Sequence, residues 1–142
     1  MEIRPLTADD TDLLRDCAPD LFDDAVVPPR AAEFLNDNRH HLIAAIAAGR
    51  IVGFLTAVHY VHPDKASAEL WINEVGVAAA WRRQGIARRL LTEVQRLAAS
   101  LHCGEVWVLT ERDNIPAMSL YASVPEARQD DAVMFTLPPL QR

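Results

Sequence analysis

A long amphipathic helix, preceded by a basic loop that contains glycine, constrains this chain more than any other feature of its sequence. From Ile86 to Leu101, apolar residues recur at steps of three and four, which predicts one helix over this range. The loop before it reads Arg82-Arg83-Gln84-Gly85-Ile86-Ala87. A helix N-terminus presents unpaired backbone N–H groups and a partial positive charge, and Gly85 leaves room for a ligand to approach. We therefore expect a phosphate-binding loop with added positive charge from Arg82 and Arg83, although an ordinary helix start with solvated arginines has the same pattern.

The rest of the sequence predicts strands and shorter helices around this loop. Strands are expected at Glu2–Leu6, His41–Ala48, Ile51–Tyr60, Ala68–Val77, Glu105–Thr110 and Ala132–Leu137. Helices are expected from Thr7 to about Cys17, at Arg30–Leu35, at Ile86–Leu101 and at Pro116–Tyr121. The strand–helix–strand order around the long helix implies that its two strands are parallel. The pattern indicates one α/β domain, residues 1–142, with a mixed sheet of about six to seven strands and helices on both faces.

Net charge and cysteine usage limit the function classes that remain. The formal charge of −6 argues against a nucleic-acid binder and suits a cationic small molecule as partner, but simple solubility also explains it. Cys17 and Cys103 lack the spacing of a metal site, and His40-His41 has no third ligand at a matching distance, so we expect no metal. The sequence shows neither a secretory leader nor an apolar run of membrane-spanning length, which predicts a cytoplasmic protein that binds no membrane.

The loop resembles the acetyl-CoA signature of the GNAT (general N-acetyltransferase) superfamily, Q/R-x-x-G-x-G/A, and the order of elements is similar along nearly the whole chain. The resemblance implies acetyl-CoA as co-substrate, with the backbone amides of Gln84 to Ala87 around its pyrophosphate. It also implies that the strand ending at Val75-Gly76-Val77 splays from the strand at Val106–Leu109. The acetyl-pantetheine arm would lie in that gap, paired with the backbone of Val75 or Val77. Gly76 fits a bulge or a close backbone approach at this point.

Glu74 is a carboxylate in the middle of the largely apolar strand at Ala68–Val77. Amine acetylation needs a base, because an ammonium group cannot attack a thioester, and in the superfamily an acidic residue near this position often takes the proton directly or through water. We expect Glu74 to be the catalytic base or a substrate anchor; an exposed carboxylate with no part in the site is the alternative. Asn73 points to the opposite face if the strand is regular. The tryptophans are expected to pack in the core and at its rim: Trp71, Trp81 and Trp107.

A second part of the resemblance lies in Asn114-Ile115-Pro116-Ala117-Met118-Ser119-Leu120-Tyr121, which is similar to the last helix of the superfamily. It implies that Asn114 contacts the cofactor arm and that the Tyr121 hydroxyl protonates the leaving CoA thiolate, a task that suits a weak acid. A tyrosine packed on the core is the alternative. The chain departs from the family after Tyr121, because Ala122–Ala127 lacks the usual L-G-F-like turn, and the path into the last strand is left open.

Within the superfamily, the chain is similar to the aminoglycoside 3-N-acetyltransferases. The residues that carry this likeness are Asp20-Leu21-Phe22, Glu69 to Val77, Arg82 to Ala87 and Thr110 to Asn114. The resemblance implies acetyl transfer to the 3-amino group of an aminoglycoside, and a homodimer, as in many relatives. Five carboxylates are candidates to surround such a cationic substrate: Asp23, Asp24, Glu74, Glu111 and Asp113. An acetyltransferase for another amine, such as a polyamine or a peptide N-terminus, and a CoA-binding module without turnover are the alternatives.

Overall fold

The computed structural model describes residues 1–141, which fall into two compact units that divide after Thr110. The first unit contains, in chain order, β1 (Glu2–Pro5), a 3-10 helix (Ala8–Asp10), α1 (Thr11–Arg15), α2 (Pro28–Asn36), β2 (His40–Ala47), β3 (Arg50–Tyr60), β4 (Ala68–Val77), a second 3-10 helix (Ala79–Trp81), α3 (Ile86–Ser100) and β5 (Cys103–Val108). The second unit contains α4 (Ile115–Ala122). No helix among residues 1–141 combines the length and the apolar character that crossing a membrane requires.

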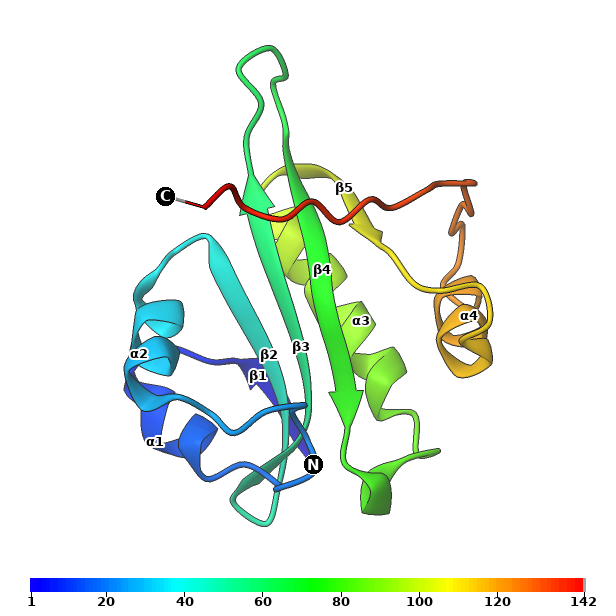
Figure 1. Ribbon diagram of the computed structural model, residues 1–142. Helices are drawn as coiled ribbons and strands as arrows, with labels where there is room; N and C mark the ends of the chain where they lie inside the picture. The colour runs from blue at the N-terminus through cyan, green and yellow to red at the C-terminus, as the bar shows by residue number, and fades with distance from the viewer. Residues whose placement is uncertain (142) are drawn as a thin grey trace. The chain divides into compact units, whose positions relative to one another are not determined.

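The first unit is built on one mixed sheet with strand order β1-β2-β3-β4-β5 (Figure 1). Neighbouring strands from β1 to β4 are antiparallel. The last strand, β5, is parallel to β4, as expected for two strands joined by the crossover helix α3. The α/β class and the mixed sheet are thus confirmed, but the described residues contain five strands, fewer than the six to seven expected.

The prediction of a strand at Ala132–Leu137 is wrong, because these residues adopt no regular secondary structure. Their apolar side chains are exposed, with Val133 80%, Phe135 81% and Leu137 81% accessible to solvent. A strand is stable when its backbone pairs with a neighbour and one of its faces is buried, and within residues 1–141 this segment has neither. Apolar composition therefore does not by itself make a strand here.

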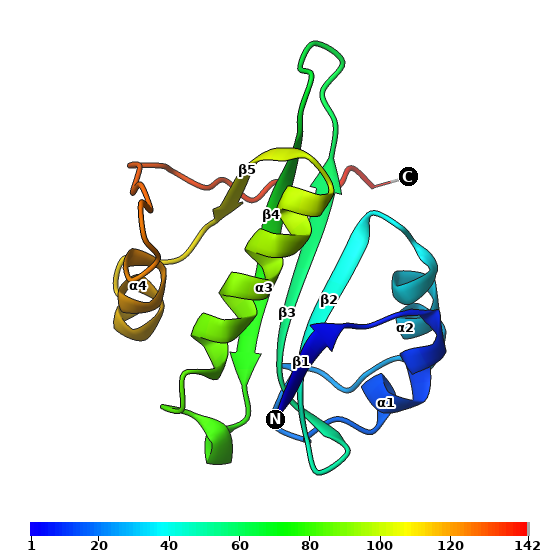
Figure 2. The ribbon, with the colours of Figure 1, turned by 180° about the vertical axis from the view of Figure 1, so that it is seen from behind.

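Alternating side chains of β2 divide the core between the two faces of the sheet. Leu42 belongs to a buried cluster with Leu14 of α1 and Ala31 of α2, so these helices cover one face. Ile43, which is fully buried, points to the other face, and α3 covers that face. Figure 2 shows α3 lying across the strands, whereas it lies behind them in Figure 1. The prediction of helices on both faces is therefore confirmed.

The first helical segment begins at Thr7 as predicted, within a capping box. The side chain of Thr7 caps the segment, and the Asp10 carboxylate accepts a hydrogen bond from the Thr7 N–H at 2.7 Å. The helix ends at Arg15, two residues earlier than predicted. The chain leaves the helix because the N–H of Ala18 donates instead to the carbonyl of Ile51 in β3, at 3.0 Å.

The ion pair between Arg4 and Asp10 makes the stability of this corner depend on pH. The guanidinium of Arg4 donates two hydrogen bonds of 2.9 Å to the carboxylate and lowers the pKa of Asp10 to about 2. Because this pKa is lower in the folded protein, the stabilisation is complete above the unfolded value of about 4 and is lost as the pH falls toward 2. We expect Asp10→Asn to lower the free energy of unfolding by about 1 kcal/mol at pH 7. Urea unfolding at pH 7 and pH 3 checks this: the difference from wild type should shrink at pH 3, and a constant difference would contradict the assignment.

Candidate functional site

Two cavities open into the first unit, and Asp23 and Glu74 line both of them. The loop-side cavity, of about 360 Å³, is lined by Asp20, Leu21, Asp23, Phe54, Glu74, Val75, Gly76, Val77 and Arg82. The helix-side cavity, of about 310 Å³, has a lining that includes Leu14, Phe22, Asp23, Asp24, Phe34, Leu42, Thr56 and Glu74. The structure therefore brings five residues of the predicted site around one cavity: Asp23, Glu74, Val75, Val77 and Arg82.

A β-bulge at Asn73 decides where Glu74 points. In the pairing of β3 with β4, Thr56 lies opposite Glu74 and the next residue of β3 lies opposite Ile72, so Asn73 is the extra residue. In a regular strand, Glu74 and Trp71 would lie on opposite faces, but the bulge places them on the same face. Glu74 and Thr56 thus line the helix-side cavity from neighbouring strands.

Gly76 allows a close approach of other groups to the β4 backbone; the bulge in this strand lies at Asn73 instead. A Cβ atom at this position would lie 2.7 Å from Cε1 of Phe54 and 3.3 Å from the carbonyl oxygen of Leu21. The glycine therefore lets the Phe54 ring and the segment before α2 pack directly on β4, where they form part of the wall of the loop-side cavity.

The expected splay of β4 from β5 can lie only beyond their last paired residues. The last parallel pair is Ile72 with Val108, whereas β4 continues to Val77. Among residues 1–141, no strand pairs with this part of β4 on the side away from β3. The exposed strand edge is the kind of surface to which an extended ligand adds by backbone hydrogen bonds.

Backbone directions at the end of β4 identify the groups on this edge. The N–H of Ala78 donates to the carbonyl of Val52 in β3 at 2.8 Å. Because successive residues of a strand direct their backbone groups to opposite sides, those of Val77 and Val75 point away from β3. The carbonyl of Val77 accepts a hydrogen bond from Nε of Arg82 at 3.1 Å, so Arg82 ties the loop to the strand.

The basic loop enters α3 through a left-handed residue. Gly85 is the N-cap, with φ of 76°, and no side chain caps the helix. A Cβ atom on Gly85 would meet nothing within 4 Å, so space is open at the helix start. The side chain of Ile86 is buried in the core, while Arg83 and Gln84 are exposed. Ile86 therefore anchors the helix, and its uncapped first turn fits an anion.

The structure groups three of the five predicted substrate carboxylates. Asp23 and Asp24 are exposed between α1 and α2, and together with Glu74 they line the helix-side cavity. Glu111 and Asp113 are exposed residues of the second unit, before α4, and their contact with a substrate stays a prediction.

Asn114 and Tyr121 are the other predicted residues of the second unit. Asn114 is the N-cap of α4, and its Oδ1 accepts a hydrogen bond from the Ala117 N–H at 3.2 Å. Tyr121 is half-buried in α4, and burial raises the pKa of its phenol. A phenol with a raised pKa is protonated at neutral pH, as a general acid must be. The roles of both residues in binding and catalysis stay predictions.

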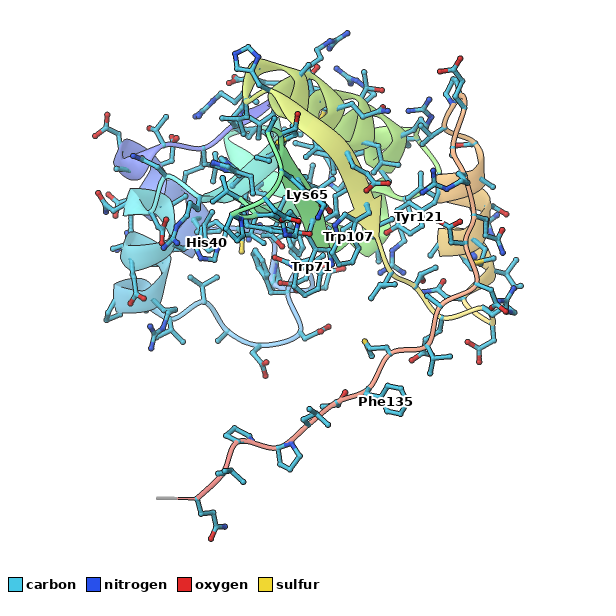
Figure 3. The ribbon with its side chains drawn as sticks, turned by 90° about the horizontal axis from the view of Figure 1, so that it is seen from above. His40, Lys65, Trp71, Trp107, Tyr121 and Phe135 are labelled. Atoms are coloured by element: carbon cyan, nitrogen blue, oxygen red, sulfur yellow. The ribbon has the colours of Figure 1, made fainter. Side chains whose placement is uncertain are left out.

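Sequence reasoning missed an aromatic wall on the same face as Glu74. The indoles of Trp71 and Trp107 are stacked, with ring centroids 5.2 Å apart and planes 8° apart (Figure 3). Nε1 of Trp107 donates to the hydroxyl of Tyr60 at 2.8 Å, and that hydroxyl donates to Glu69 at 3.3 Å. Trp71 is 37% exposed, so part of its side chain is accessible to solvent. This arrangement depends on strand register, which no local sequence pattern reveals.

His41, at the start of β2, is paired with a histidine of β3. Nε2 of His41 lies 2.7 Å from Nδ1 of His59, and burial, followed by the nearby charge of His59, lowers the pKa of His41 to about 4. Among residues 1–141, no group of three or more histidine, cysteine or acidic side chains is placed to hold a metal ion.

Comparison with known proteins gives a family match. Residues 10–124 match the acetyltransferase (GNAT) family. A mycothiol acetyltransferase from Pseudarthrobacter chlorophenolicus is 34% identical over 96 residues, which cover 66% of this chain and 29% of that protein. The chain therefore spans less than a third of the length of this curated relative.

Solved structures with the same fold include several N-acetyltransferases. An aminoglycoside acetyltransferase from an uncultured soil metagenomic sample, in complex with sisomicin, has a TM-score of 0.84 and 21% identity over 97% of this chain and 95% of that one. AAC(6')-Iy in complex with a CoA-linked acetylneamine bisubstrate analogue has a TM-score of 0.80 and 20% identity over 98% of both chains. A ribosomal-protein-alanine N-acetyltransferase from Brucella melitensis has a TM-score of 0.72 and 18% identity over 97% and 99%. At these identities the likeness establishes the fold.

Proposed function

The chain belongs to the acetyltransferase (GNAT) family, and from this premise we propose that it transfers the acetyl group of acetyl-CoA to an amine of a cationic small molecule. Acetyl-CoA is the donor that this family uses, and solved structures of the same fold hold CoA or a CoA bisubstrate analogue. The observation that carries the proposal is the position of Glu74, which lines both the loop-side cavity and the acidic helix-side cavity. The family match spans both compact units, which supports a single functional domain over residues 1–142.

The loop side fits the donor. The backbone amides from Gln84 to Ala87 bind the pyrophosphate at the uncapped start of α3, and Arg82 and Arg83 add positive charge. Val75 pairs with the pantetheine arm through its backbone. Val77 contributes its N–H, because its carbonyl already accepts from Arg82.

The helix side fits the acceptor. Glu74 takes a proton from the ammonium group, directly or through water, while Asp23 and Asp24 attract the cation. The free amine then attacks the thioester carbonyl, and the C–S bond breaks as the new C–N bond forms. Tyr121 donates its proton to the leaving thiolate, with Asn114 on the cofactor arm. These roles fit the exposed Glu74 carboxylate and the raised pKa of the Tyr121 phenol.

For the acceptor we propose an aminoglycoside. The carboxylates of Asp23, Asp24 and Glu74 in the helix-side cavity suit a molecule with several ammonium groups. Glu111 and Asp113 of the second unit are the further carboxylates that we propose for binding it. The stacked Trp71–Trp107 pair is the kind of flat apolar surface on which a sugar ring lies. The resemblance in sequence predicts the 3-amino group, whereas the solved structure whose name gives a position is AAC(6')-Iy. The position is therefore part of the test.

An acetyl-transfer assay tests the proposal. Thiol release from acetyl-CoA is measured with gentamicin, sisomicin, spermidine and a peptide with a free N-terminal alanine, and the acetylated position is read by NMR. We expect kcat/KM for an aminoglycoside at least tenfold above the other amines. Turnover of spermidine or the peptide alone would identify another acceptor. A rise in Tm with acetyl-CoA but no turnover of any amine would identify a CoA-binding module.

Trp71→Ala tests the aromatic wall directly. We expect the KM for the aminoglycoside to rise about tenfold, because a stacked aromatic contact contributes about 1–1.5 kcal/mol. The KM for acetyl-CoA should stay within about twofold, and Trp71→Phe should recover most of the loss since the phenyl ring still offers a face. Steady-state kinetics with each substrate varied in turn measures both KM values. Equal aminoglycoside KM values for wild type and Trp71→Ala would show that Trp71 does not contact the substrate.

We further propose a homodimer in the cytoplasm that acts without nucleic acid or membrane. The exposed apolar side chains of Val133, Phe135 and Leu137 support a partner copy, because such surface favours association. Cys17 and Cys103 are both free thiols, which fits a reducing compartment. Light scattering after gel filtration measures the mass, and a value near that of the 15.8 kDa chain would contradict the dimer.

A further inference from the structure

The hydroxyl of Thr56 is buried without a hydrogen-bond partner. The Thr56 side chain is buried, with 6% of the residue exposed. Of the buried side-chain oxygen and nitrogen atoms in residues 1–141, only Oγ1 of Thr56 makes no hydrogen bond. A buried polar group without a partner destabilises the folded protein, so most such groups are paired. An exception in the centre of a sheet therefore needs a reason, and a ligand that completes the pairing is one.

Thr56 lies beside the proposed catalytic base in the helix-side cavity. It lines that cavity from β3, and the register of the sheet sets it directly opposite Glu74 on β4. Side chains that face each other across an antiparallel pair have Cβ atoms about 5 Å apart, so one small polar group can contact both. The ionised carboxylate of Glu74 can only accept hydrogen bonds, whereas the hydroxyl can donate and accept.

Apolar side chains form much of the cavity lining, together with the charged side chains of Asp23, Asp24 and Arg30. Leu14, Phe22, Phe34 and Leu42 line the same cavity, from α1, the segment before α2, α2 and β2. Thr56 and Glu74 therefore offer polar partners on the sheet for a bound molecule, while the apolar side chains suit its carbon framework. A primary amine on a ring or chain has this chemistry.

We propose that Thr56 is an acceptor-binding residue, whose hydroxyl accepts a hydrogen bond from the ammonium group that Glu74 deprotonates. The inference rests on the proposed function and adds a second contact at the reacting nitrogen. One N–H of the ammonium group points to Thr56 and another to Glu74. After the proton moves to the carboxylate, the contact with Thr56 orients the lone pair of the amine.

Thr56→Val tests this assignment, because valine keeps the shape and removes the hydroxyl. We expect the KM for the amine to rise at least about tenfold, as for a lost hydrogen bond to a charged group, with the KM for acetyl-CoA within about twofold. The Tm of the protein without ligand should rise by a few degrees, because an unpaired buried hydroxyl is gone. Thr56→Ser keeps the hydroxyl and should restore the amine KM to near the wild-type value.

Thr92→Val is the matched control on α3. The hydroxyl of Thr92 has partners: it accepts from Nη1 of Arg88 at 3.1 Å and donates to the Arg88 carbonyl at 3.2 Å. We expect its loss to lower the Tm and to leave both KM values unchanged. If wild type acetylates an amine and the amine KM of Thr56→Val is within twofold of the wild-type value, the role of Thr56 is overturned and the proposed function is not. Absence of turnover by wild type with every amine overturns the proposed function and the inference with it.

Discussion

Replacing Glu74 by glutamine is expected to lower kcat for acetyl transfer by about 10²–10⁴-fold. Glutamine keeps the size of the side chain and its place in both cavities, but it cannot accept a proton at neutral pH. The reacting amine then has to enter already deprotonated, so the residual rate should increase with pH as the free-amine fraction in solution increases. Steady-state kinetics of wild type and Glu74→Gln from pH 6 to pH 9 measures both effects.

Asp23→Asn separates a base from a simple negative charge. Asp23 lines the same two cavities as Glu74, so its replacement removes one negative charge from the same two linings. We expect a several-fold rise in the amine KM with kcat reduced by less than about threefold, because an electrostatic attraction acts on binding. If Glu74→Gln changed kcat no more than Asp23→Asn does, Glu74 would be an anchor for the substrate and the base would lie elsewhere. We expect acetyl-CoA to raise the Tm of wild type and of both variants by the same amount.

The sequence predicts the parts of the fold that local patterns determine. The helix expected at Ile86–Leu101 is α3, Ile86–Ser100, because its spacing of apolar residues repeats over four turns. The strand expected at Ala132–Leu137 fails because a strand depends on a distant partner, which composition does not contain. The observed sheet is smaller than the expected one for the same reason, because Ala132–Leu137 counts among the expected strands.

The same distinction holds for the site. Glu74 and the loop before α3 are visible in sequence, because a carboxylate in an apolar strand and a glycine before a helix are local signals. The bulge at Asn73 is a property of the pairing with β3, and it decides that Glu74 faces Thr56 and shares a face with Trp71. Thr56 carries one local signal, as the polar side chain within the apolar run Ile51–Val58, but its missing partner is visible only in the folded protein.

Gly85→Ala is expected to weaken acetyl-CoA binding by about tenfold or more, while the protein stays folded. Gly85 has φ of 76°, so an alanine there costs about 1 kcal/mol of backbone strain. The new methyl group meets no protein atom within 4 Å, and it projects instead into the space at the start of α3 where the pyrophosphate is proposed to bind. Isothermal titration calorimetry with acetyl-CoA measures the change in Kd.

Gly49→Ala controls for the strain, because the two glycines are matched. Gly49, in the turn between β2 and β3, also has φ of 76°, and a Cβ atom there also meets nothing within 4 Å. Both variants should therefore lose about the same Tm, since the backbone penalty is the same. Only Gly85→Ala should lose affinity for acetyl-CoA. Equal Kd values for the two variants would show that the start of α3 does not hold the phosphates, and the loop from Arg82 to Ala87 would then be an ordinary entry into a helix.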